Sequence, residues 1–490
     1  MAMRLISTRT GVEATPEQAV LCGLAPDGGL FVPAYFPKVS MEEIESYSDM
    51  PYAQVSAAVL GRFFDAIPKE QLLGMCQRAY ASFSDERVVP IRPIEDRLYA
   101  MELYHGPTLA FKDVALQILP ELMAYSAQNC GDGKKILILV ATSGDTGKAA
   151  LEGFCDKPGT AIAVFYPDDG VSPAQRLQMA TQKGENVAVF ALEGDFDACQ
   201  RGVKTLMSDT AFLERLDRAG YALSSANSIN FGRLAPQVAY YFYAYAQLRK
   251  AGEIQKGESV DFVVPTGNFG NILAGWYAKQ MGLPVGKLVC ASNENNVLSR
   301  FFASGTYAAG EVLHKTTSPS MDILISSNLE RLLFELTGRD GALIRQWMQA
   351  QKIGQPFTVP EEMMRRAEAD FAADWASDEQ GAQAIRKVFE RTGFVLDTHA
   401  AVGYCAYEAT RSERATVLAC TASPYKFAQD VLAALGQRGE DARDASNRLA
   451  EVTHTQVPQA ITDLWQARIL HEDCITQGQM EEAVCGRIQA

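Results

Sequence analysis

The sequence has few of the features that mark metalloproteins, disulfide-bonded proteins and membrane proteins. Its 490 residues include only 5 His, in no H-E-x-x-H or comparable spacing, so a metal site of that kind is not expected. Its 10 Cys form no C-x-x-C pair, and we expect buried, reduced thiols. No apolar run approaches the ~20 residues of a membrane span, and the N-terminus lacks the apolar core of a secretory signal. We therefore expect a cytoplasmic protein with no metal site and no membrane partner.

Positive charge is also in deficit. The chain has 45 Lys and Arg against 59 Asp and Glu, which leaves a formal net charge of −14. Surfaces that bind nucleic acid are typically basic, so we do not expect a nucleic-acid partner. An acidic total still permits a local site for a small anion, built from a helix N-terminus and a few basic side chains.

Five short apolar runs, each followed by a turn and a helical pattern, indicate the fold class. They span 136–140, 161–165, 187–192, 260–264 and 416–420. Continuous runs of this length are typical of strands buried on both faces. Strand–turn–helix units in series predict a parallel sheet covered by helices, and therefore an α/β fold.

The length and the changes of pattern predict several domains, because 490 residues exceed one ordinary core. Residues 1–90 show helical patterns at 41–48 and 69–84 without a series of parallel strands, which predicts a mainly helical N-terminal domain. The catalytic part is expected over 91–435, and a charged helical segment over 436–490. Within the catalytic part, a helical insertion at about 300–400 should contain helices at 327–336, 360–376 and 379–392.

Two glycine-containing turns follow expected strands and open expected helices. They are Ser143-Gly-Asp-Thr-Gly-Lys148 and Thr266-Gly-Asn-Phe-Gly-Asn271. Ligands of open α/β sheets lie at the carboxyl ends of the strands, where these turns are expected. Converging N–H groups at a helix start suit a phosphate. The first turn fails as a P-loop, since Thr142 replaces its first glycine and Ala149 its Ser or Thr, and the second lacks G-x-G-x-x-G. For the second turn, a tight turn without a ligand remains the alternative.

Lys112 lies at the start of a third expected helix, which runs past Gln117 with a kink at Pro120. A lysine is ordinarily a solvated surface charge. Here the preceding residues, Thr108-Leu-Ala-Phe111, are apolar or small. In an apolar pocket a lysine loses its proton more easily and becomes a nucleophile toward an aldehyde.

A series of motifs resembles, in order, those of the threonine synthase family, in its long bacterial and fungal branch. His105-Gly-Pro-Thr-Leu-Ala-Phe-Lys112-Asp113 is similar to the lysine signature with which that family binds pyridoxal phosphate (PLP). The further motifs are Ser7-Thr-Arg9, Gly23-Leu-Ala-Pro-Asp-Gly-Gly-Leu-Phe-Val-Pro33, Ser143-Gly-Asp-Thr-Gly, Gly194-Asp-Phe-Asp-Ala, Ser225-Ala-Asn-Ser-Ile-Asn-Phe-Gly-Arg233, Pro265-Thr-Gly-Asn-Phe-Gly-Asn, Ser320-Met-Asp-Ile and Thr421-Ala-Ser-Pro-Tyr-Lys-Phe427. The similarity covers roughly residues 5–435, and the ordered set is far more specific than any one motif.

The resemblance implies the tryptophan-synthase-like fold of PLP enzymes, fold type II, with two parallel-sheet lobes covered by helices. It implies conversion of O-phospho-L-homoserine and water to L-threonine and phosphate, by γ-elimination and β-addition of water. Lys112 would hold PLP as a Schiff base and shuttle protons at Cα and Cβ. The partner would be this small-molecule substrate, and the chain would be a monomer or a homodimer.

The resemblance also implies roles for other residues. Gly267, Asn268, Phe269, Gly270 and Asn271 would hold the cofactor phosphate, Thr421 would approach the pyridine nitrogen, and Asp145 would face the 3′-oxygen. Ser143, Thr146, Asn227, Ser228 and Arg233 would meet the carboxylate or phosphate of the substrate. A carboxylate beside a phenolate-like oxygen leads us to expect a raised pKa at Asp145, or a proton shared with that oxygen.

Ordinary structural explanations remain open for several of these residues. Asp145 could cap a helix, Arg233 could form a surface ion pair, and Asn227 and Ser228 could cap a loop. Ser423 stands where many family members have His, which leaves its role open. Two alternative functions also stand: another fold-type-II lyase such as threonine dehydratase, or a non-catalytic homologue that binds phosphorylated ligands.

Overall fold

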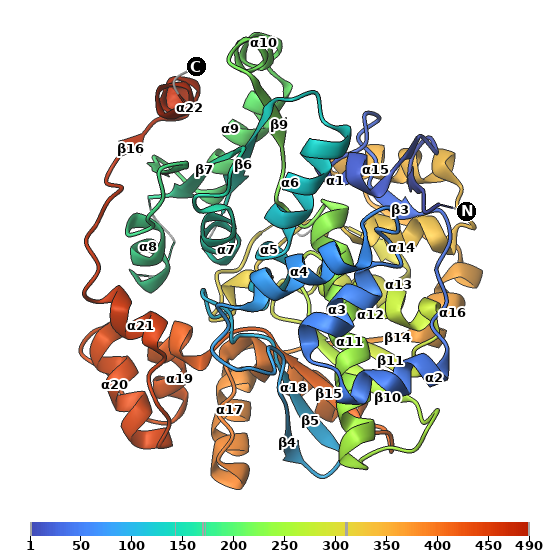
Figure 1. The fold of residues 1–490 in the computed structure, drawn as a ribbon. Helices are drawn as coiled ribbons and strands as arrows, with labels where there is room; N and C mark the ends of the chain where they lie inside the picture. Colours follow the sequence, from blue (N-terminus) through green and yellow to red (C-terminus); the bar gives the residue numbers. More distant parts are fainter. Residues whose placement is uncertain (1, 143, 169–170, 172, 309–311, 489–490) are drawn as a thin grey trace.

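Two sheets, each in its own lobe, form the framework of the molecule (Figure 1). The computed structural model describes residues 2–142, 144–168, 171, 173–308 and 312–488. The sheet of the small lobe has the strand order β16 (Cys474–Ile475), β8 (Val187–Leu192), β7 (Thr160–Pro167), β6 (Lys135–Ala141), β9 (Tyr221–Ser224). The sheet of the large lobe has the order β14 (Phe371–Trp375), β11 (Val285–Ser292), β10 (Val260–Pro265), β15 (Thr416–Cys420), β5 (Leu98–Glu102), β4 (Ile91–Glu95).

The strand pairs of these two sheets are parallel except at β4, which lies antiparallel to β5 at the edge of the large sheet. All residues of β7, β8, β10 and β15 are buried, which explains their continuous apolar sequences. The expected α/β class is confirmed, and the five predicted strands are present as β6, β7, β8, β10 and β15. Sequence analysis did not predict β5, β9, β11 and β14.

Helices cover both faces of the small sheet. Leu137 and Leu139 of β6 pack with α9 (Phe196–Ser208), α10 (Thr210–Arg218) and α22 (Met480–Ile488). The alternate residues Ile138 and Val140 point to the other face, toward α7 (Asp145–Phe154) and α8 (Pro173–Ala180). Because successive side chains of a strand face opposite sides, both faces of β6 are apolar. The turn between β6 and α7 is therefore held between two packed layers.

The large sheet is covered in the same way. On one face lie α17 (Asp378–Thr392), α18 (Thr398–Thr410), α19 (Ala428–Ala434), α20 (Ala442–Thr453) and α21 (Gln459–Leu464). On the other face lie α11 (Phe231–Ala251) and α12 (Gly270–Met281). Further helices follow in the region expected to be a helical insertion: α13 (Val297–Ser304), α14 (Leu329–Leu336), α15 (Gly341–Lys352) and α16 (Glu361–Asp370).

The N-terminal region packs on α11. It contains α1 (Pro16–Cys22), α2 (Met41–Ser46), α3 (Tyr52–Leu60) and α4 (Lys69–Tyr80). It also contains an antiparallel sheet of β1 (Leu5–Ser7), β2 (Glu13–Ala14) and β3 (Phe31–Pro33), which sequence analysis did not predict. Tyr52 makes edge-to-face contacts with Tyr80 and with Tyr243 of α11, so the core continues from this region into the large lobe.

Two predicted helices differ from the observed ones. The helix expected at 360–376 ends at Asp370, and Phe371–Trp375 forms β14, because pairing with β11 outweighs the helix propensity of its alanines. The helix that begins at Lys112 was expected to continue past Gln117 with a kink at Pro120. Instead α5 (Lys112–Leu116) ends and α6 (Leu119–Cys130) begins, with Pro120 in its first turn. A proline lacks an N–H and is well placed at a helix start.

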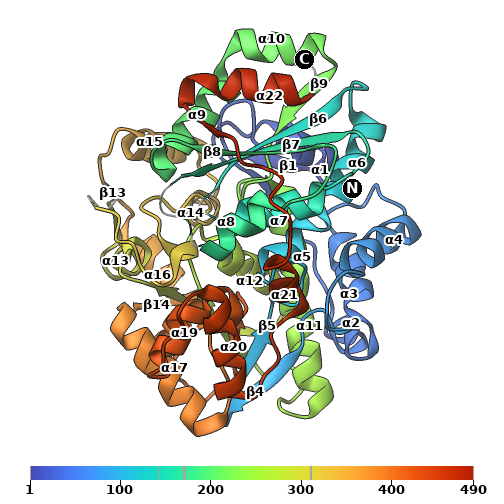
Figure 2. The ribbon, with the colours of Figure 1, turned by 90° about the vertical axis from the view of Figure 1, so that its left-hand side faces the viewer.

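The C-terminal segment connects the two lobes along the outside of the molecule (Figures 1 and 2). Its helices α20 and α21 pack on the large lobe, whereas β16 pairs with β8 and α22 packs on the small lobe. Leu470 and His471 donate backbone hydrogen bonds of 2.8 and 3.0 Å to Ala180 O at the end of α8. The segment is therefore helical only in part, with an extended stretch between α21 and α22.

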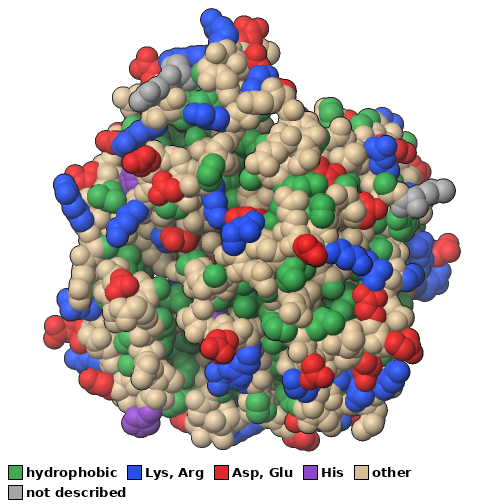
Figure 3. All heavy atoms as spheres, viewed as in Figure 1, with side chains coloured by type: hydrophobic (Ala, Val, Ile, Leu, Met, Phe, Trp, Pro, Cys, Tyr) green, Lys and Arg blue, Asp and Glu red, His purple; other side chains and the backbone are tan. Residues whose placement is uncertain are grey.

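The surface carries charges of both signs, interspersed over the face shown in Figure 3. Within the described ranges, every helix is too short or too polar to cross a lipid bilayer. All ten cysteines are free thiols. The expectation that they are buried is wrong for Cys22, Cys130 and Cys474, which are exposed.

Candidate active site

Lys112 lies where the large lobe meets the small lobe. The segment before it runs beside the end of β15, where the Phe111 N–H donates to Thr421 O at 2.8 Å and the Ser423 N–H donates to Leu109 O at 3.0 Å. These bonds bring Thr421 beside the first residue of α5. The side chain of Lys112 is 10% exposed, so its amine is largely removed from water.

The loop that precedes Lys112 is held by Asp113. Its buried carboxylate accepts hydrogen bonds from the Thr108 N–H at 2.8 Å and from Thr108 Oγ1 at 2.6 Å. Gly106 packs directly against it, since a Cβ at Gly106 would lie 2.4 Å from Asp113 Cβ. Burial raises the pKa of Asp113 to about 6, against the effect of the bonds from Thr108. Gly106 and Asp113, two residues of the lysine motif, therefore hold the loop before Lys112 in place.

Asp145 is the centre of a buried charge cluster. Its Oδ1 lies 2.6 Å from the Lys426 ammonium and accepts from Gln175 Nε2 at 3.1 Å. Its Oδ2 accepts from Ser320 Oγ at 2.9 Å and lies 3.5 Å from Lys112 Nζ. Burial by itself would raise the pKa of Asp145, but the two ammonium groups outweigh burial and hold it well below its usual value. With these partners the pKa of Asp145 is lowered rather than raised, and the proton shared with the 3′-oxygen stays a prediction.

The turn before Asp145 requires glycine. Gly144 has a φ of 144°, and a Cβ there would lie 2.4 Å from Gln175 Nε2. Gly144, not Asp145, is the N-cap residue of α7, and the described partners of the Asp145 carboxylate are side chains outside this helix, so the helix-cap explanation of Asp145 is wrong. Thr146 follows in the first turn of α7 and is half-buried, and Ser143 lies outside the described residues.

The Lys112 amine has weaker partners than Lys426. Its Nζ donates to Ser320 Oγ at 3.3 Å and lies 3.5 Å from Asp145. Burial lowers the pKa of Lys112 to about 8; Asp145 opposes this shift, and Arg233 and Lys426 add to it. About a tenth of this amine is therefore unprotonated at pH 7, and only this form is a nucleophile.

The glycine turn after β10 adjoins the same cluster. Gly267 lies against the 3₁₀ turn η2 (Pro319–Met321), because a Cβ at Gly267 would be 2.9 Å from Ser320 O. The ring of Phe269 is buried against Phe302 and Phe371, so this residue offers only its backbone to the turn. Gly270 opens α12, whose first N–H groups lie beyond the reach of intrahelical acceptors.

Asn271, in the first turn of α12, has a donor without a partner. Its Oδ1 accepts from Tyr240 OH at 2.5 Å and from Tyr241 OH at 2.8 Å, which fixes the orientation of the amide. Its Nδ2 is buried and, within the described structure, donates to no group. A buried donor left unpaired is costly, and a phosphate oxygen would satisfy it.

Arg233, in the first turn of α11, lies near Lys112, and the loop before α11 approaches the turn after β10. Arg233 is buried and donates from Nη1 to Ala226 O at 3.0 Å, and burial lowers its pKa to about 10. It pairs with no carboxylate in the described ranges, so the explanation as a surface ion pair is wrong. Ser228 Oγ lies 3.3 Å from Ser327 Oγ, which lies 3.4 Å from Asn268 Oδ1. Asn227 is half-buried in the same loop, and its carbonyl accepts from the Asn230 N–H at 3.0 Å.

Sequence analysis missed several residues of this cluster. Lys426 and Ser320 stand inside the quoted motifs, but nothing in the sequence showed that their side chains meet Asp145. The ring of His399 accepts at Nε2 from the Ser320 N–H at 3.2 Å, while Nδ1 lies 2.8 Å from Asp397 Oδ2. These bonds assign the proton of a neutral ring to Nδ1. Ser423, whose role was open, accepts from the Tyr425 N–H at 3.4 Å and caps the turn that carries Lys426.

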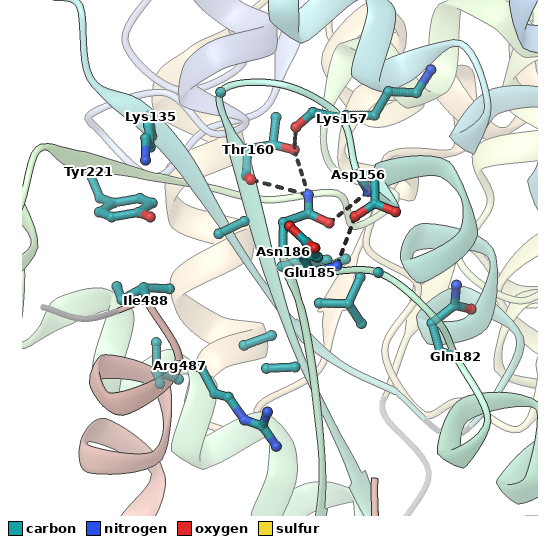
Figure 4. Close-up of a pocket in the computed structure, with 18 of the residues that line it drawn as sticks. Lys135, Asp156, Lys157, Thr160, Gln182, Glu185, Asn186, Tyr221, Arg487 and Ile488 are labelled. Carbon is teal, nitrogen blue, oxygen red and sulfur yellow. Dashed lines mark hydrogen bonds between the residues drawn. The ribbon is translucent and has the colours of Figure 1, made fainter. Parts of the chain in front are cut away.

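A cavity of about 860 Å³ lies elsewhere, at the opposite edge of the small sheet (Figure 4). Lys135, Thr160 and Tyr221, at the starts of their strands, line it together with Arg487 of α22. Asp145 lies at the other edge, after the end of β6, and none of the residues that sequence analysis assigned to the site lines this cavity. In the described part of the chain, no three His, Cys, Asp or Glu side chains are grouped as metal ligands would be.

Comparisons with known proteins agree with this geometry. Residues 4–80 match the family model described as threonine synthase N terminus, and residues 87–421 match the model described as pyridoxal-phosphate dependent enzyme. The chain is 40% identical to threonine synthase from Pseudomonas aeruginosa over 440 residues, 89% of this chain and 91% of that protein. It is 40% identical over 431 residues to threonine synthase-like 1 from Homo sapiens, covering 85% of this chain but only 58% of that relative's length.

A solved structure gives the same result. The fold matches the crystal structure of PLP-bound threonine synthase from Brucella melitensis with a TM-score of 0.90 and 38% identity, and the match covers 100% of both chains. A buried amine, a glycine turn with an unpaired Asn271 donor, and Thr421 beside Lys112 fit the aldehyde, phosphate and ring of that cofactor. The chain belongs to the threonine synthase family of pyridoxal-phosphate-dependent enzymes.

Proposed function

We propose that this protein converts O-phospho-L-homoserine and water to L-threonine and phosphate. One observation carries the proposal: the buried amine of Lys112 lies close enough to the buried guanidinium of Arg233 for that charge to lower its pKa, and Arg233 has no acidic partner in the described ranges. The amine suits an aldehyde cofactor, and the uncompensated cation suits a dianionic phosphate. Threonine synthases from Pseudomonas aeruginosa and Saccharomyces cerevisiae are 40% and 38% identical to most of this chain, which supports the same activity.

The cofactor would be held at three points. Lys112 would bind its aldehyde, and Thr421 would approach its ring nitrogen. Backbone N–H groups of Gly267, Asn268, Phe269 and Gly270, with the Asn271 amide, would hold its phosphate. Bound PLP supplies an electron sink for carbanions that form next to the amino group of the substrate. An ionised Asp145 would face its 3′-oxygen and would accept a hydrogen bond from that oxygen when it is protonated.

The substrate would be held by the groups around Arg233. The guanidinium would bind the departing phosphate in bidentate fashion and stabilise its charge. Ser143 and Thr146 would add hydroxyl donors at the start of α7, and Asn227 and Ser228 would orient the carboxylate. Because these side chains come from both lobes, closure of the lobes on the substrate would exclude water other than the reacting molecule.

Lys112 would also move the protons. When it is not bound to the cofactor, its amine would be a base in a buried site. A base whose pKa is about 8 can both remove a proton from Cα and return one at Cβ near neutral pH. Ser320, which contacts both Lys112 and Asp145, would keep the amine on the side of the carboxylate.

The location, oligomeric state and domain division of the enzyme belong to the same proposal. We place it in the cytoplasm as a monomer or a homodimer. We divide the chain into an N-terminal domain over 1–90, a catalytic domain over 91–435 and a C-terminal segment over 436–490. In this division the catalytic domain carries all the proposed site residues.

The test is threonine formation from O-phospho-L-homoserine by wild type and by Lys112→Ala. We expect threonine and phosphate in equal amounts from wild type, and a loss of at least ~10³-fold in the variant, because nucleophile and base are removed together. Cofactor content should be measured by absorbance in both proteins. Phosphate without threonine would indicate a different lyase, and a wild type that binds PLP without turnover would indicate a ligand-binding homologue.

A further inference from the structure

The site contains a second buried lysine that the proposed chemistry does not use. Lys426 is 1% exposed in its side chain, against 10% for Lys112. It reaches the cluster from η3 (Pro424–Phe427), the turn that follows β15. Its ammonium lies 2.6 Å from Asp145 Oδ1 and donates to Thr108 O at 2.9 Å. Burying a second positive charge beside a reactive lysine costs free energy. This cost suggests that Lys426 has a function in the site.

The two lysines compete for one carboxylate, and Lys426 has the better geometry. It approaches Oδ1 at 2.6 Å, whereas Lys112 lies 3.5 Å from Oδ2 and bonds the Ser320 hydroxyl at 3.3 Å. Gln175 and Ser320 also donate to Asp145, at 3.1 and 2.9 Å. The carboxylate is therefore neutralised and satisfied without Lys112.

We propose that Lys426 is a positioning residue of this site: by pairing with Asp145, it leaves the amine of Lys112 free to bind the cofactor. The inference rests on the proposed function only in taking PLP as the ligand of Lys112. Only the unprotonated amine attacks the aldehyde carbon; a C–N bond forms and one water leaves. A proton that Asp145 held on Lys112 would block this step, and the pairing with Lys426 weakens that hold.

Other charged groups face the two lysines and do not change this direction. Arg233 of α11 adds positive charge near Lys112, and Asp113 of α5 adds a carboxyl near Lys426. Asp397 and His399 reach the cluster through the Ser320 N–H. Burial, Arg233 and Lys426 all lower the pKa of Lys112, to about 8, against Asp145. Removal of Lys426 leaves Lys112 as the ammonium group that pairs with Asp145. The pKa of Lys112 should therefore rise, and the amine should keep its proton to higher pH.

The experiment measures the rate at which apoprotein captures PLP, followed by the absorbance of bound cofactor, as a function of pH. For wild type we expect the rate to rise with pH, with a midpoint near the pKa of Lys112, about 8. In Lys426→Met the midpoint should move up by about one pH unit or more, the usual effect of one neighbouring charge. Lys426→Arg should keep the wild-type midpoint. The ionisation of PLP itself is common to all variants.

A second pair of variants isolates the charge of Lys426 if Lys426→Met does not fold. In Asp145→Asn the carboxylate is lost and Lys426 remains; in Asp145→Asn/Lys426→Met both charges are lost. If Lys426 cancels the effect of Asp145 on the amine, the midpoint of the double variant should equal that of wild type, and the midpoint of Asp145→Asn should lie below both. A double-variant midpoint about one pH unit or more below that of wild type, or an unchanged midpoint in folded Lys426→Met, would overturn the proposal. Because capture needs no substrate, these outcomes are independent of whether the protein makes threonine.

Discussion

Two turns at the carboxyl ends of parallel strands form the site, and they differ in charge. The turn after β10 has glycines, a helix N-terminus and the unpaired Asn271 amide, but no carboxylate. The turn after β6 has a glycine and a helix N-terminus too, but it places Asp145 at the first position of α7. The turn after β10 is suited to bind an anion, whereas the turn after β6 carries the Asp145 carboxylate.

The difference shows that a glycine turn at a helix start does not by itself define a phosphate site. In the turn after β6, Asp145 adds a carboxylate, and Lys426 neutralises it. In the turn after β10, the N–H groups and Asn271 stay available for a ligand. In the proposed function, the turn after β6 would serve the reactive end of the cofactor and the turn after β10 its phosphate end.

The largest expected effect is the removal of the carboxylate from the turn after β6. Asp145→Asn leaves the Lys426 ammonium buried without a counter-ion, which costs ~3–5 kcal/mol of unfolding free energy. Urea denaturation of the apoprotein, followed by circular dichroism, measures this loss. The double variant Asp145→Asn/Lys426→Met should recover part of it, because no charge is then left unpaired. Equal stabilities of the single and double variants would contradict the ion pair.

The next effect concerns the backbone of the same turn. Gly144→Ala forces a Cβ to 2.4 Å from Gln175 Nε2 at a φ of 144°, so we expect a loss of ~2–3 kcal/mol in unfolding free energy. Gly159→Ala is the matched control in the small lobe, since its φ is 75° with no atom within 4 Å of the added Cβ. It should lose only the backbone contribution of ~1–2 kcal/mol. A loss at Gly144 no greater than at Gly159 would mean that Gln175 moves away freely.

The third prediction concerns the turn after β10. A Cβ at Gly270 would meet its nearest atom, Asn328 Nδ2, at 3.5 Å, an ordinary contact, so Gly270→Ala should fold with nearly wild-type stability. If the cofactor phosphate lies against this residue, the methyl group should weaken PLP binding about 10-fold, or ~1.4 kcal/mol. Equilibrium titration of the apoprotein with PLP measures the affinity. Unchanged affinity would place the phosphate elsewhere.

The fold was predictable from the sequence where burial acts on both faces of a strand. Continuous apolar runs marked β6, β7, β8, β10 and β15, since every position in such strands meets a packed layer. The strand β14 was not predictable, because Phe-Ala-Ala-Asp-Trp continues a helical pattern and becomes a strand only by pairing with β11. Local preference and tertiary pairing oppose each other there, and the pairing decides.

The site was predictable to the extent that its residues lie in ordered motifs. Lys112 and the glycine turns could be named from the sequence, because their neighbours in the chain define them. The charge cluster could not be named, since Gln175, Ser320 and Lys426 come from three distant elements and meet only at Asp145. The raised pKa expected for Asp145 was wrong for this reason: the ammonium group that lowers it is 281 residues away in the chain, as the numbers 145 and 426 show.

The smallest expected effect tests whether the chemistry is confined to the carboxyl edges of the sheets. The 860 Å³ cavity lies at the amino edge of the small sheet, where Lys135 and Arg487 offer positive charge. If that cavity took part in the reaction, Lys135→Gln or Arg487→Gln would raise the KM for O-phospho-L-homoserine. We expect kcat/KM to stay within about twofold of wild type, because the cavity is separated from Asp145 by the length of β6. A twofold change corresponds to ~0.4 kcal/mol of transition-state free energy. Steady-state kinetics on both variants, with Arg233→Gln as the positive control for lost phosphate binding, decide between the two edges.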